Sequence, residues 1–216
     1  MENKEFENEQ VRETKKKPTW QKSMLMYLHD LVYLLAVVML VLLLCFRVVV
    51  VSGTSMNSTL LDGDYLLLLS NVFYPDPQFG DVIVASKHGF DDGKPIVKRV
   101  IATEGQWVDI DFEAGVVKIS DDGMKSWRTL EEDYTNTATT LPEGTQFPLY
   151  VAEGHIFVLG DNRDASRDSR DPVIGLIDKR EVLGKVLFLF LPGTNGTDAL
   201  GQPNEPRDFG RIGVVD

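Results

Sequence analysis

Apolar residues dominate one stretch of the chain, Leu31–Val51, in which Arg47 is the single charged side chain. As a helix rising about 1.5 Å per residue, these 21 residues would extend about 30 Å, the thickness of a bilayer core. Because Arg47 lies near one end of the stretch, its long side chain can reach the headgroup region. The pattern therefore predicts a transmembrane anchor over 24–51 and an N-terminal tail over 1–23.

The charges on either side of this anchor predict its orientation. Lys15–Lys17 and Lys22 precede the apolar stretch, whereas Asp62 and Asp64 follow it. By the positive-inside tendency, the tail is cytoplasmic and the rest of the chain is exported. A cleaved signal peptide is the alternative, but its apolar region would be only about 7–15 residues long and followed by small residues. The present stretch begins 30 residues into the chain and ends in four valines, which favours an uncleaved anchor.

From Ser52 onward the pattern changes to short apolar runs separated by glycine, aspartate and proline. Such runs at close spacing are typical of an antiparallel β domain, which we expect over 52–191. The expected strands are Tyr65–Leu69, Asp81–Ser86, Ile96–Thr103, Gln106–Phe112, Gly115–Ser120, Leu149–Ala152, His155–Leu159 and Val182–Leu191. Residues 123–147 are polar and weakly patterned, so we interpret them as an insertion. The C-terminal tail over 192–216 is rich in turn-forming residues, and we expect it to run over the surface or to be disordered.

Charge and composition limit the kinds of partner and site that we expect. The chain has a net charge of −11, and from Ser52 onward it contains 15 basic and 27 acidic residues. We therefore do not expect nucleic acid as a partner, since its phosphates would repel such a domain. The single cysteine, Cys45, cannot form an intrachain disulfide. The histidines His29, His88 and His155 are widely spaced, so we expect neither a zinc site nor a Ser/His/Asp triad, and no metal or cofactor.

A turn-like stretch just after the anchor, Ser52–Leu60, contains the candidate nucleophile Ser55. Gly53 lies two residues earlier, and a glycine there lets the backbone approach a substrate closely. It also leaves local N–H groups, such as that of Ser55, available to a developing oxyanion. Most serines in surface loops have no catalytic role, so this stretch alone does not decide the question.

Lys98 is the candidate base because it interrupts an apolar strand pattern. If Ile96–Ala102 is a strand, Lys98 shares one face with Ile96, Val100 and Ala102. Burial on that face would disfavour the ammonium and lower the lysine pKa, so that a neutral amine could take the proton of a serine hydroxyl. The alternative is a lysine on the solvated edge of the strand, paired with an acid. The pattern alone leaves both open.

Four acids and three arginines lie in the dozen residues Gly160–Asp171, directly after the apolar run Ile156–Leu159. A loop of this kind at the end of a core strand can brace a site through bidentate arginine–carboxylate pairs. A solvated loop of weak ion pairs is the alternative. A calcium loop is not favoured, because Arg163 occupies a position that needs a ligand.

Together these stretches resemble type I signal peptidases, the membrane-anchored serine proteases that remove signal peptides from exported proteins. The blocks that match the family's motifs, in order, are Ser52–Leu60, Gly63–Leu67, Phe79–Val84 with Val97–Ile101, and Gly160–Arg170, continuing through Gly175–Ile177 to Gly184–Lys185. The similarity covers the anchor and most of 48–191. The short interval between Lys98 and Gly160 is similar to that of the compact Gram-positive forms. The resemblance implies the β fold that these peptidases share with self-cleaving Ser/Lys repressor proteases.

The resemblance also implies roles for particular residues. Ser55 matches the nucleophile, Lys98 the general base, and Ser166 the hydroxyl that orients the base. Gly53 replaces a serine that donates to the oxyanion hole in some members, and Ser58 replaces a proline of the family motif. The residues that match those bracing the site are Asp161, Asp168, Arg170 and, as an ion-pair partner, Arg99.

The implied function is hydrolysis of one peptide bond in preproteins that bear a signal peptide, on the outer side of the cytoplasmic membrane. Substrates with small residues, Ala-x-Ala-like, would bind in shallow apolar pockets. Candidate pocket walls or bilayer-facing surfaces are Val48–Val51, Leu66–Leu69 and Val72–Tyr74, although Leu66–Leu69 fits an ordinary core strand better. One alternative is a repressor protease, which would need a DNA-binding module that residues 1–30 do not provide. The other is a non-catalytic, anchored β domain acting as an assembly or binding subunit.

Overall fold

The computed structural model describes residues 20–87, 89–197 and 202–215. The predicted tail over 1–23, with Lys15–Lys17, lies outside these residues except for its last four positions, and His88 lies outside them too. The chain divides into two compact units, 1–43 and 44–216. The described part of the first unit is helical, and the second contains two antiparallel sheets.

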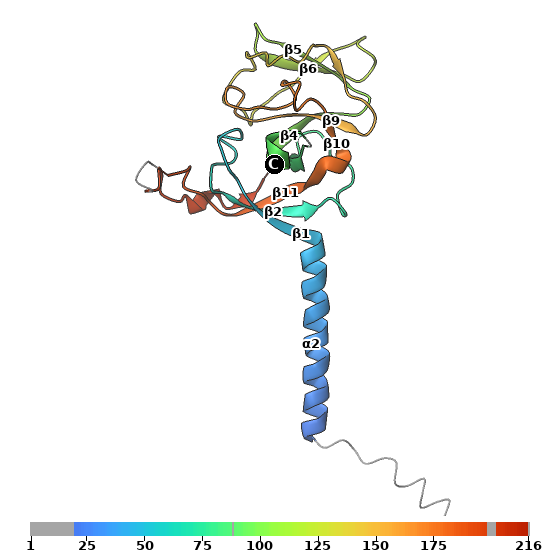
Figure 1. Cartoon of the computed structure of the whole chain (residues 1–216), viewed down its shortest axis with the longest axis vertical. Helices are drawn as coiled ribbons and strands as arrows, with labels where there is room; N and C mark the ends of the chain where they lie inside the picture. The colour runs from blue at the N-terminus through green and yellow to red at the C-terminus, as the bar shows by residue number, and fades with distance from the viewer. Residues whose placement is uncertain (1–19, 88, 198–201, 216) are drawn as a thin grey trace, which may run out of the picture. The chain divides into compact units, whose positions relative to one another are not determined.

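The apolar stretch near the N-terminus forms the helix α2, Trp20–Cys45 (Figure 1). Its 26 residues extend about 39 Å at 1.5 Å per residue, more than the thickness of a bilayer core. None of them is buried by other described residues, and the helix is long and apolar enough to cross a membrane. Its side chains therefore need an apolar environment that the described chain does not supply.

The apolar pattern predicted that the helix would continue to residue 51, but it does not. It ends at Cys45, and Phe46–Val50 forms the strand β1, which pairs with β2, Tyr65–Ser70. Valine is β-branched, so a short run of valines fits a pleated, paired strand well. Apolar length alone cannot make this distinction. The expectation of one helical span over 24–51 is corrected accordingly, whereas the role of α2 as an anchor stays a prediction.

The larger sheet has eight strands, and its paired strands are all antiparallel. Their order is β1-β2-β11-β3-β4-β9-β10, and β12 pairs with β11 outside this path. Besides β1 and β2, the strands are β3 Val82–Ser86, β4 Pro95–Thr103, β9 His155–Leu159, β10 Ile177–Asp178, β11 Val182–Leu191 and β12 Gly213–Val214. Within this sheet, β11 lies between β2 and β3, so it joins the pair β1-β2 to the strands β3, β4, β9 and β10.

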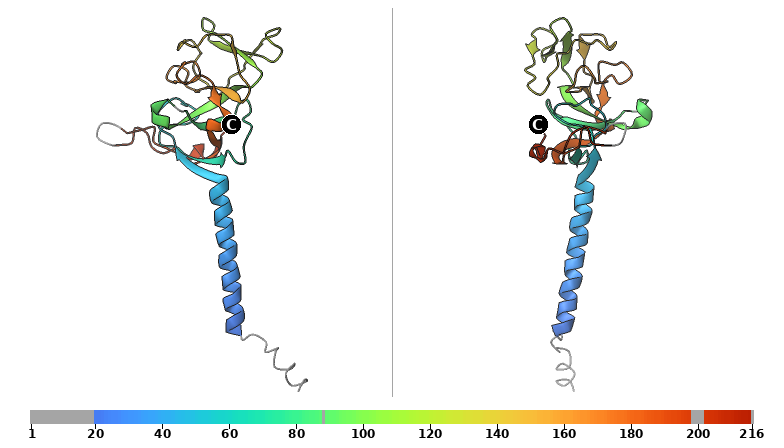
Figure 2. Two further views of the ribbon diagram at one scale, coloured as in Figure 1. Left: turned by 45° about the vertical axis from the view of Figure 1, so that its right-hand side comes forward. Right: turned by 90° about the vertical axis from the view of Figure 1, so that its left-hand side faces the viewer.

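The smaller sheet has four strands in the order β7-β6-β5-β8. They are β5 Trp107–Asp111, β6 Val116–Ser120, β7 Arg128–Thr129 and β8 Leu149–Tyr150. In both views of Figure 2 this sheet forms a separate layer next to β4 and β9. One cluster of buried side chains joins the two sheets and includes Ile101 of β4, Val108 of β5, Ile119 of β6 and Phe157 of β9. The segment 123–147 contributes β7 and otherwise irregular chain to this layer.

The strands predicted from alternation are all present, within two residues at each end. The fold class, a mainly antiparallel β domain with one N-terminal apolar helix, is confirmed. The pattern missed β1 and the two-residue strands β7, β10 and β12. It also missed three short 3-10 helices, which are η1 Asp91–Gly93, η2 Lys179–Glu181 and η3 Phe209–Arg211.

The predicted C-terminal tail is in part built into the domain. Gly213 and Val214 pair with Leu189 and Phe188 of β11, and Val215 is buried. The expectation of a surface or disordered tail is therefore wrong for the buried Val215, whereas Val214 is paired but exposed. The sequence gives no sign of this strand, because two residues are too few to show a periodicity. Residues 198–201 and 216 of this tail lie outside the described part.

The loop between β1 and β2 is anchored by two side chains that enter the core of the larger sheet. Met56 and Leu60 are buried and cluster with Leu66 and Leu68 of β2 and with Val186 of β11. The leucine run of β2 is thus an ordinary core strand, as its alternation indicated. The loop cannot shift without pulling large apolar side chains out of a packed interior.

Candidate active site

Ser55 lies in the loop that connects β1 to β2. The base of the loop is closed by backbone bonds, with the Val51 N–H donating to the Asp64 carbonyl at 2.9 Å. The Gly63 N–H donates in turn to the Val51 carbonyl at 3.0 Å. Together with the buried side chains of the loop, these bonds hold the half-buried Ser55 in one position.

Lys98 lies on β4 with its side chain against Ser55. Its Nζ is 2.7 Å from the Ser55 Oγ, and the lysine is only 4% exposed. Among the described residues, Lys98 forms no ion pair with a carboxylate, and Ser55 is its one side-chain hydrogen-bond partner. The alternative of a solvated edge lysine paired with an acid is therefore wrong.

Burial controls the charge of this lysine. Desolvation of the ammonium lowers the pKa of Lys98 from 10.5 to about 8. The negative charges of Asp168, Asp161 and Glu143 oppose this shift, and the positive charge of Arg170 adds to it. The neutral amine is therefore available at mildly alkaline pH, as is needed for a group that accepts a proton from a hydroxyl.

Two strands present unpaired edges near Ser55 and Lys98. Ile83 of β3 pairs with Lys98 on one side, whereas pairing of β4 with β9 begins only at Arg99. The outer edge of β1 is likewise unpaired in the part of the chain that the structure describes. Backbone groups on such edges can pair with a further extended chain.

A cavity of about 400 Å³ lies at these edges and reaches Ser55 and Lys98. Its walls include Val49 and Val50 of β1, and Ile96 and Val97 of β4. The predicted pocket wall Val48–Val51 therefore contributes to this cavity. The other two candidate walls, the leucine run of β2 and Val72–Tyr74, do not line it.

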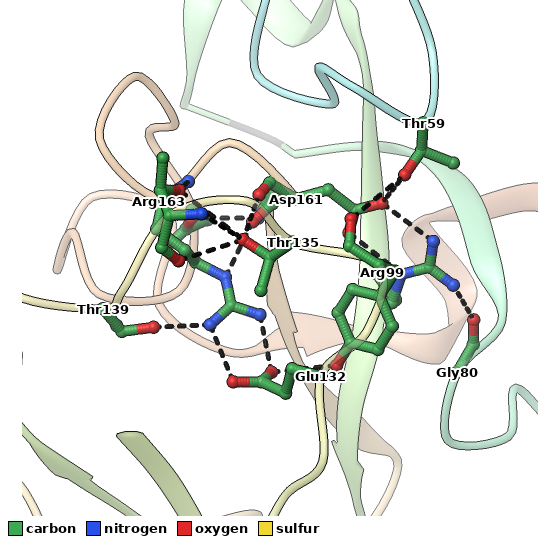
Figure 3. A network of polar contacts seen from close by, with 12 residues as sticks. Thr59, Gly80, Arg99, Glu132, Thr135, Thr139, Asp161 and Arg163 are labelled. Carbon is green, nitrogen blue, oxygen red and sulfur yellow. Dashed lines mark hydrogen bonds and ion pairs between the residues drawn. The ribbon is translucent and has the colours of Figure 1, made fainter. Parts of the chain in front are cut away.

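Asp161 and Arg99 form a buried pair beside the Ser55 loop (Figure 3). The Arg99 Nε donates to Asp161 Oδ1 at 2.9 Å, and Nη2 donates to Oδ2 at 2.8 Å, so the pair is bidentate. The Thr59 Oγ1 donates to the same carboxylate at 2.5 Å. The remaining arginine nitrogen donates to the Gly80 carbonyl at 2.8 Å. Through Thr59, this pair ties the Ser55 loop to β4, the strand that carries Lys98.

The residue after Asp161 contacts the nucleophile segment directly. The Asn162 N–H donates to the Ser55 carbonyl at 3.0 Å, and its side-chain Nδ2 donates to the Thr54 carbonyl at 3.0 Å. Gly160 lies equally close, because a Cβ added there would be 2.5 Å from the Ser55 carbonyl oxygen and 2.2 Å from the Ser166 Oγ. Position 160 therefore accepts only glycine while Ser55 and Ser166 stay in place.

Asp168 and Arg170 form a second buried pair in the same loop. The Arg170 Nε donates to Asp168 Oδ1 at 2.9 Å, and both side chains are fully buried. Asp168 Oδ2 accepts the Gly160 N–H at 3.0 Å, while Arg170 Nη2 donates to the carbonyls of Arg163 and Ser166. The predicted arginine–carboxylate pairs thus exist, and they fix the backbone that packs on Ser55.

Ser166 and Gly53 are the two remaining predicted site residues. Ser166 is buried, but its Oγ has no hydrogen-bond partner among the described residues. Its expected role in orienting Lys98 therefore stays a prediction without a hydrogen bond to support it. Gly53 has a φ of +95° and donates its N–H to Asp62 Oδ1 at 2.7 Å. The Ser55 N–H, in contrast, donates to no acceptor in the described chain.

The sequence reasoning missed several residues that hold this site together. Arg163 is buried and pairs with Glu132 at 2.6 Å, and its Nη1 donates to Thr139 at 2.5 Å, which ties the loop after β9 to the 123–147 segment (Figure 3). From the same segment, Thr135 donates to the Asp161 carbonyl at 2.6 Å, and the ring of Tyr134 covers the Arg99 guanidinium at 4.1 Å. These contacts join residues far apart in the chain, so no local pattern in the sequence predicts them.

Comparison with protein families matches residues 24–191 to the family described as signal peptidase, peptidase S26. The chain is 34% identical over 155 residues to a probable signal peptidase I-1 of Synechocystis sp., covering 67% of this chain and 70% of that protein. It is 32% identical over 184 residues to a signal peptidase I of Bacillus licheniformis, covering 83% of this chain and 95% of that protein. A crystal structure of a signal peptidase I from Enterococcus faecalis V583 aligns with 28% identity and a TM-score of 0.39, covering 51% of this chain and 96% of that one.

Proposed function

Since this chain belongs to the signal peptidase family, peptidase S26, we propose that Ser55 and Lys98 are the catalytic pair of its activity. The chain is a serine endopeptidase that removes signal peptides. The observation that carries the residue assignment is the 2.7 Å contact between Lys98 Nζ and Ser55 Oγ, made by a lysine that pairs with no carboxylate in the described part of the chain. A buried amine in this setting loses its proton readily and can act as a base.

The reaction proceeds through an acyl-enzyme. Neutral Lys98 takes the proton of the Ser55 hydroxyl as Oγ attacks the scissile carbonyl carbon, and the resulting ammonium gives that proton to the leaving amine. An ester then links the substrate's new carboxyl end to Ser55. Lys98 next takes a proton from a water molecule, which attacks the ester carbonyl, and the proton returns to Oγ as the ester bond breaks.

The free N–H of Ser55 is the donor that we assign to the oxyanion. It belongs to the nucleophile itself, so it lies next to the carbonyl under attack, where negative charge develops. It donates to no acceptor among the described residues, which leaves it available for that charge. Gly53 cannot supply a second donor, because it has no side chain and its N–H is already bonded to Asp62.

The substrate is a preprotein that bears a signal peptide, bound as an extended segment. The unpaired edges of β1 and of the first residues of β4 offer backbone groups for strand addition. Between them, Val49, Val50, Ile96 and Val97 provide an apolar wall. Such an apolar wall suits uncharged side chains beside the cut, in agreement with the Ala-x-Ala preference that the family resemblance implies.

The test is cleavage of one labelled preprotein by the purified full chain in detergent. Ser55→Ala should abolish cleavage because no nucleophile remains, while thermal unfolding stays close to that of the wild type. Lys98→Arg should also be inactive, because arginine stays protonated. The matched control is Ser126→Ala, which removes an exposed hydroxyl from the smaller-sheet layer and should leave cleavage unchanged.

Retained cleavage by Ser55→Ala would refute the assignment of the nucleophile. Cleavage by none of the proteins, wild type included, would instead favour the non-catalytic anchored domain. Mass spectrometry of the products locates the bond that is cut and separates signal-peptide removal from general proteolysis.

A further inference from the structure

The C-terminal segment contacts the loop that carries Ser55, although it lies beyond the family match, which ends at residue 191. Arg211, the last residue of η3, reaches the buried carboxylate of Asp64. Its Nη2 donates to Asp64 Oδ2 at 2.7 Å, and its Nη1 donates to Oδ1 at 3.0 Å. The same Nη2 also lies 3.3 Å from the Thr59 carbonyl oxygen, inside the loop.

Asp64 is the point at which the loop closes. Its side chain is fully buried and accepts the Leu61 N–H at 2.8 Å and the Gly193 N–H at 2.6 Å, besides the two bonds from Arg211. Its own carbonyl accepts the Val51 N–H at the other end of the loop. Residues 51–64 therefore form one closed loop around Ser55, and Arg211 is the one cation that pairs with its carboxylate among the described residues.

The position of Arg211 connects this closure to the rest of the site. Thr59, whose carbonyl contacts Arg211, donates its hydroxyl to Asp161, and Asp161 pairs with Arg99 on the strand of Lys98. Arg211 and Asp161 thus both contact Thr59, Arg211 at its carbonyl and Asp161 at its hydroxyl. A buried carboxylate that loses its cation is left with an uncompensated charge, and the surrounding chain must relax to solvate it.

We propose that Arg211 is a positioning residue, which keeps the closed loop 51–64 in the geometry that places the Ser55 Oγ against Lys98. Arg211 lies outside the substrate cavity and does not touch the reacting atoms. The proposal rests on the proposed roles of Ser55 and Lys98. It assigns part of the C-terminal segment a function in the reaction itself, in addition to its packing on β11.

The test compares three variants of the full chain in detergent. Arg211→Met removes both the charge and the hydrogen bonds, while Arg211→Lys keeps the charge on a side chain that cannot bind bidentately. The matched control is Arg207→Met, because Arg207 lies in the same segment but donates to the Pro192 carbonyl rather than to the loop. Each protein is assayed for kcat, KM and thermal unfolding, with cleavage measured well below the lowest unfolding temperature.

Arg211→Met should lower kcat by about 10- to 100-fold, since a small displacement of a nucleophile costs this much. Its KM should change less than kcat, because the cavity walls on β1 and β4 lie outside the loop. Arg211→Lys should restore part of kcat, and Arg207→Met should behave like the wild type. Amide hydrogen exchange should be faster over 51–64 in Arg211→Met only.

Wild-type kcat in Arg211→Met would overturn the proposal, and so would equal losses in Arg211→Met and Arg207→Met. If Arg211→Met does not fold, Arg211→Lys carries the comparison, and a kcat equal to that of the wild type overturns the proposal. These results differ from a failure of the proposed function, which would show as retained activity in Ser55→Ala. The exchange measurement needs no substrate, so it tests the contact between Arg211 and the loop by itself.

Discussion

At the scale of single residues, the proposed role of Lys98 as the base predicts how activity depends on pH. Burial lowers its pKa to about 8, and the base is the deprotonated form. We therefore expect kcat/KM to rise with pH through the region near 8 and to level off above it, because the fraction of neutral amine increases. A profile measured from pH 6 to 10 checks this, and a flat profile would contradict the assignment of Lys98 as the base.

The same residue shows what sequence reasoning could and could not supply. An apolar strand pattern interrupted by a lysine made Lys98 a candidate base but left its burial open, and the structure places it buried on β4. Ser55 was found through its turn-like stretch and the family resemblance. Gly160 and Asn162 were not singled out, because they act through backbone contacts with Ser55 that only the folded chain creates.

At the scale of elements, alternation of apolar residues predicted the long strands because each has one face in a core. It failed at β1, whose valines continue a membrane-length apolar stretch, and at β7, β10 and β12, whose two residues are too few for a period to show. The charged cluster Gly160–Asp171 was recognised as a bracing loop. Its partners in the 123–147 segment were not, because ion pairs across about 30 residues leave no local signal.

The pairing of Arg163 with Glu132 should be important for the stability of the loop after β9. Arg163 and Glu132 side chains are 1% and 10% exposed, so Glu132→Gln leaves a buried guanidinium without its counter-charge. We expect this variant to lower the free energy of unfolding by about 3 kcal/mol. Urea unfolding measures the change, with Glu131→Gln as the control, because Glu131 is exposed and adjacent in sequence. Equal stability of the two variants would show that the pair contributes little.

At the scale of the whole molecule, the helix α2 and the charges around it predict a fixed orientation in the cell membrane. Relatives of the same family and the apolar character of α2 agree with membrane attachment. The proposed orientation places Lys22 on the cytoplasmic side and Lys125, an exposed residue of the smaller-sheet layer, on the outer side.

Labelling of single cysteines tests this orientation. In a Cys45→Ser background, Lys125→Cys should react with a membrane-impermeant maleimide on intact cells. Lys22→Cys should react only after the membrane is permeabilised. The reverse pattern would place the peptidase on the wrong side of the membrane for exported preproteins.

The strand order of the larger sheet has a consequence for chains that are not yet fully synthesised. The pair β1-β2, which flanks Ser55, is joined in the sheet to β3 and to β4, the strand of Lys98, through β11. The strand β11 spans Val182–Leu191 in a chain of 216 residues, so it follows all the strands that it joins. An incomplete chain that lacks β11 would have β1-β2 and β3-β4 as separate pairs of strands, with Ser55 next to the first pair and Lys98 in the second. We therefore expect a chain without β11 to be inactive as a peptidase.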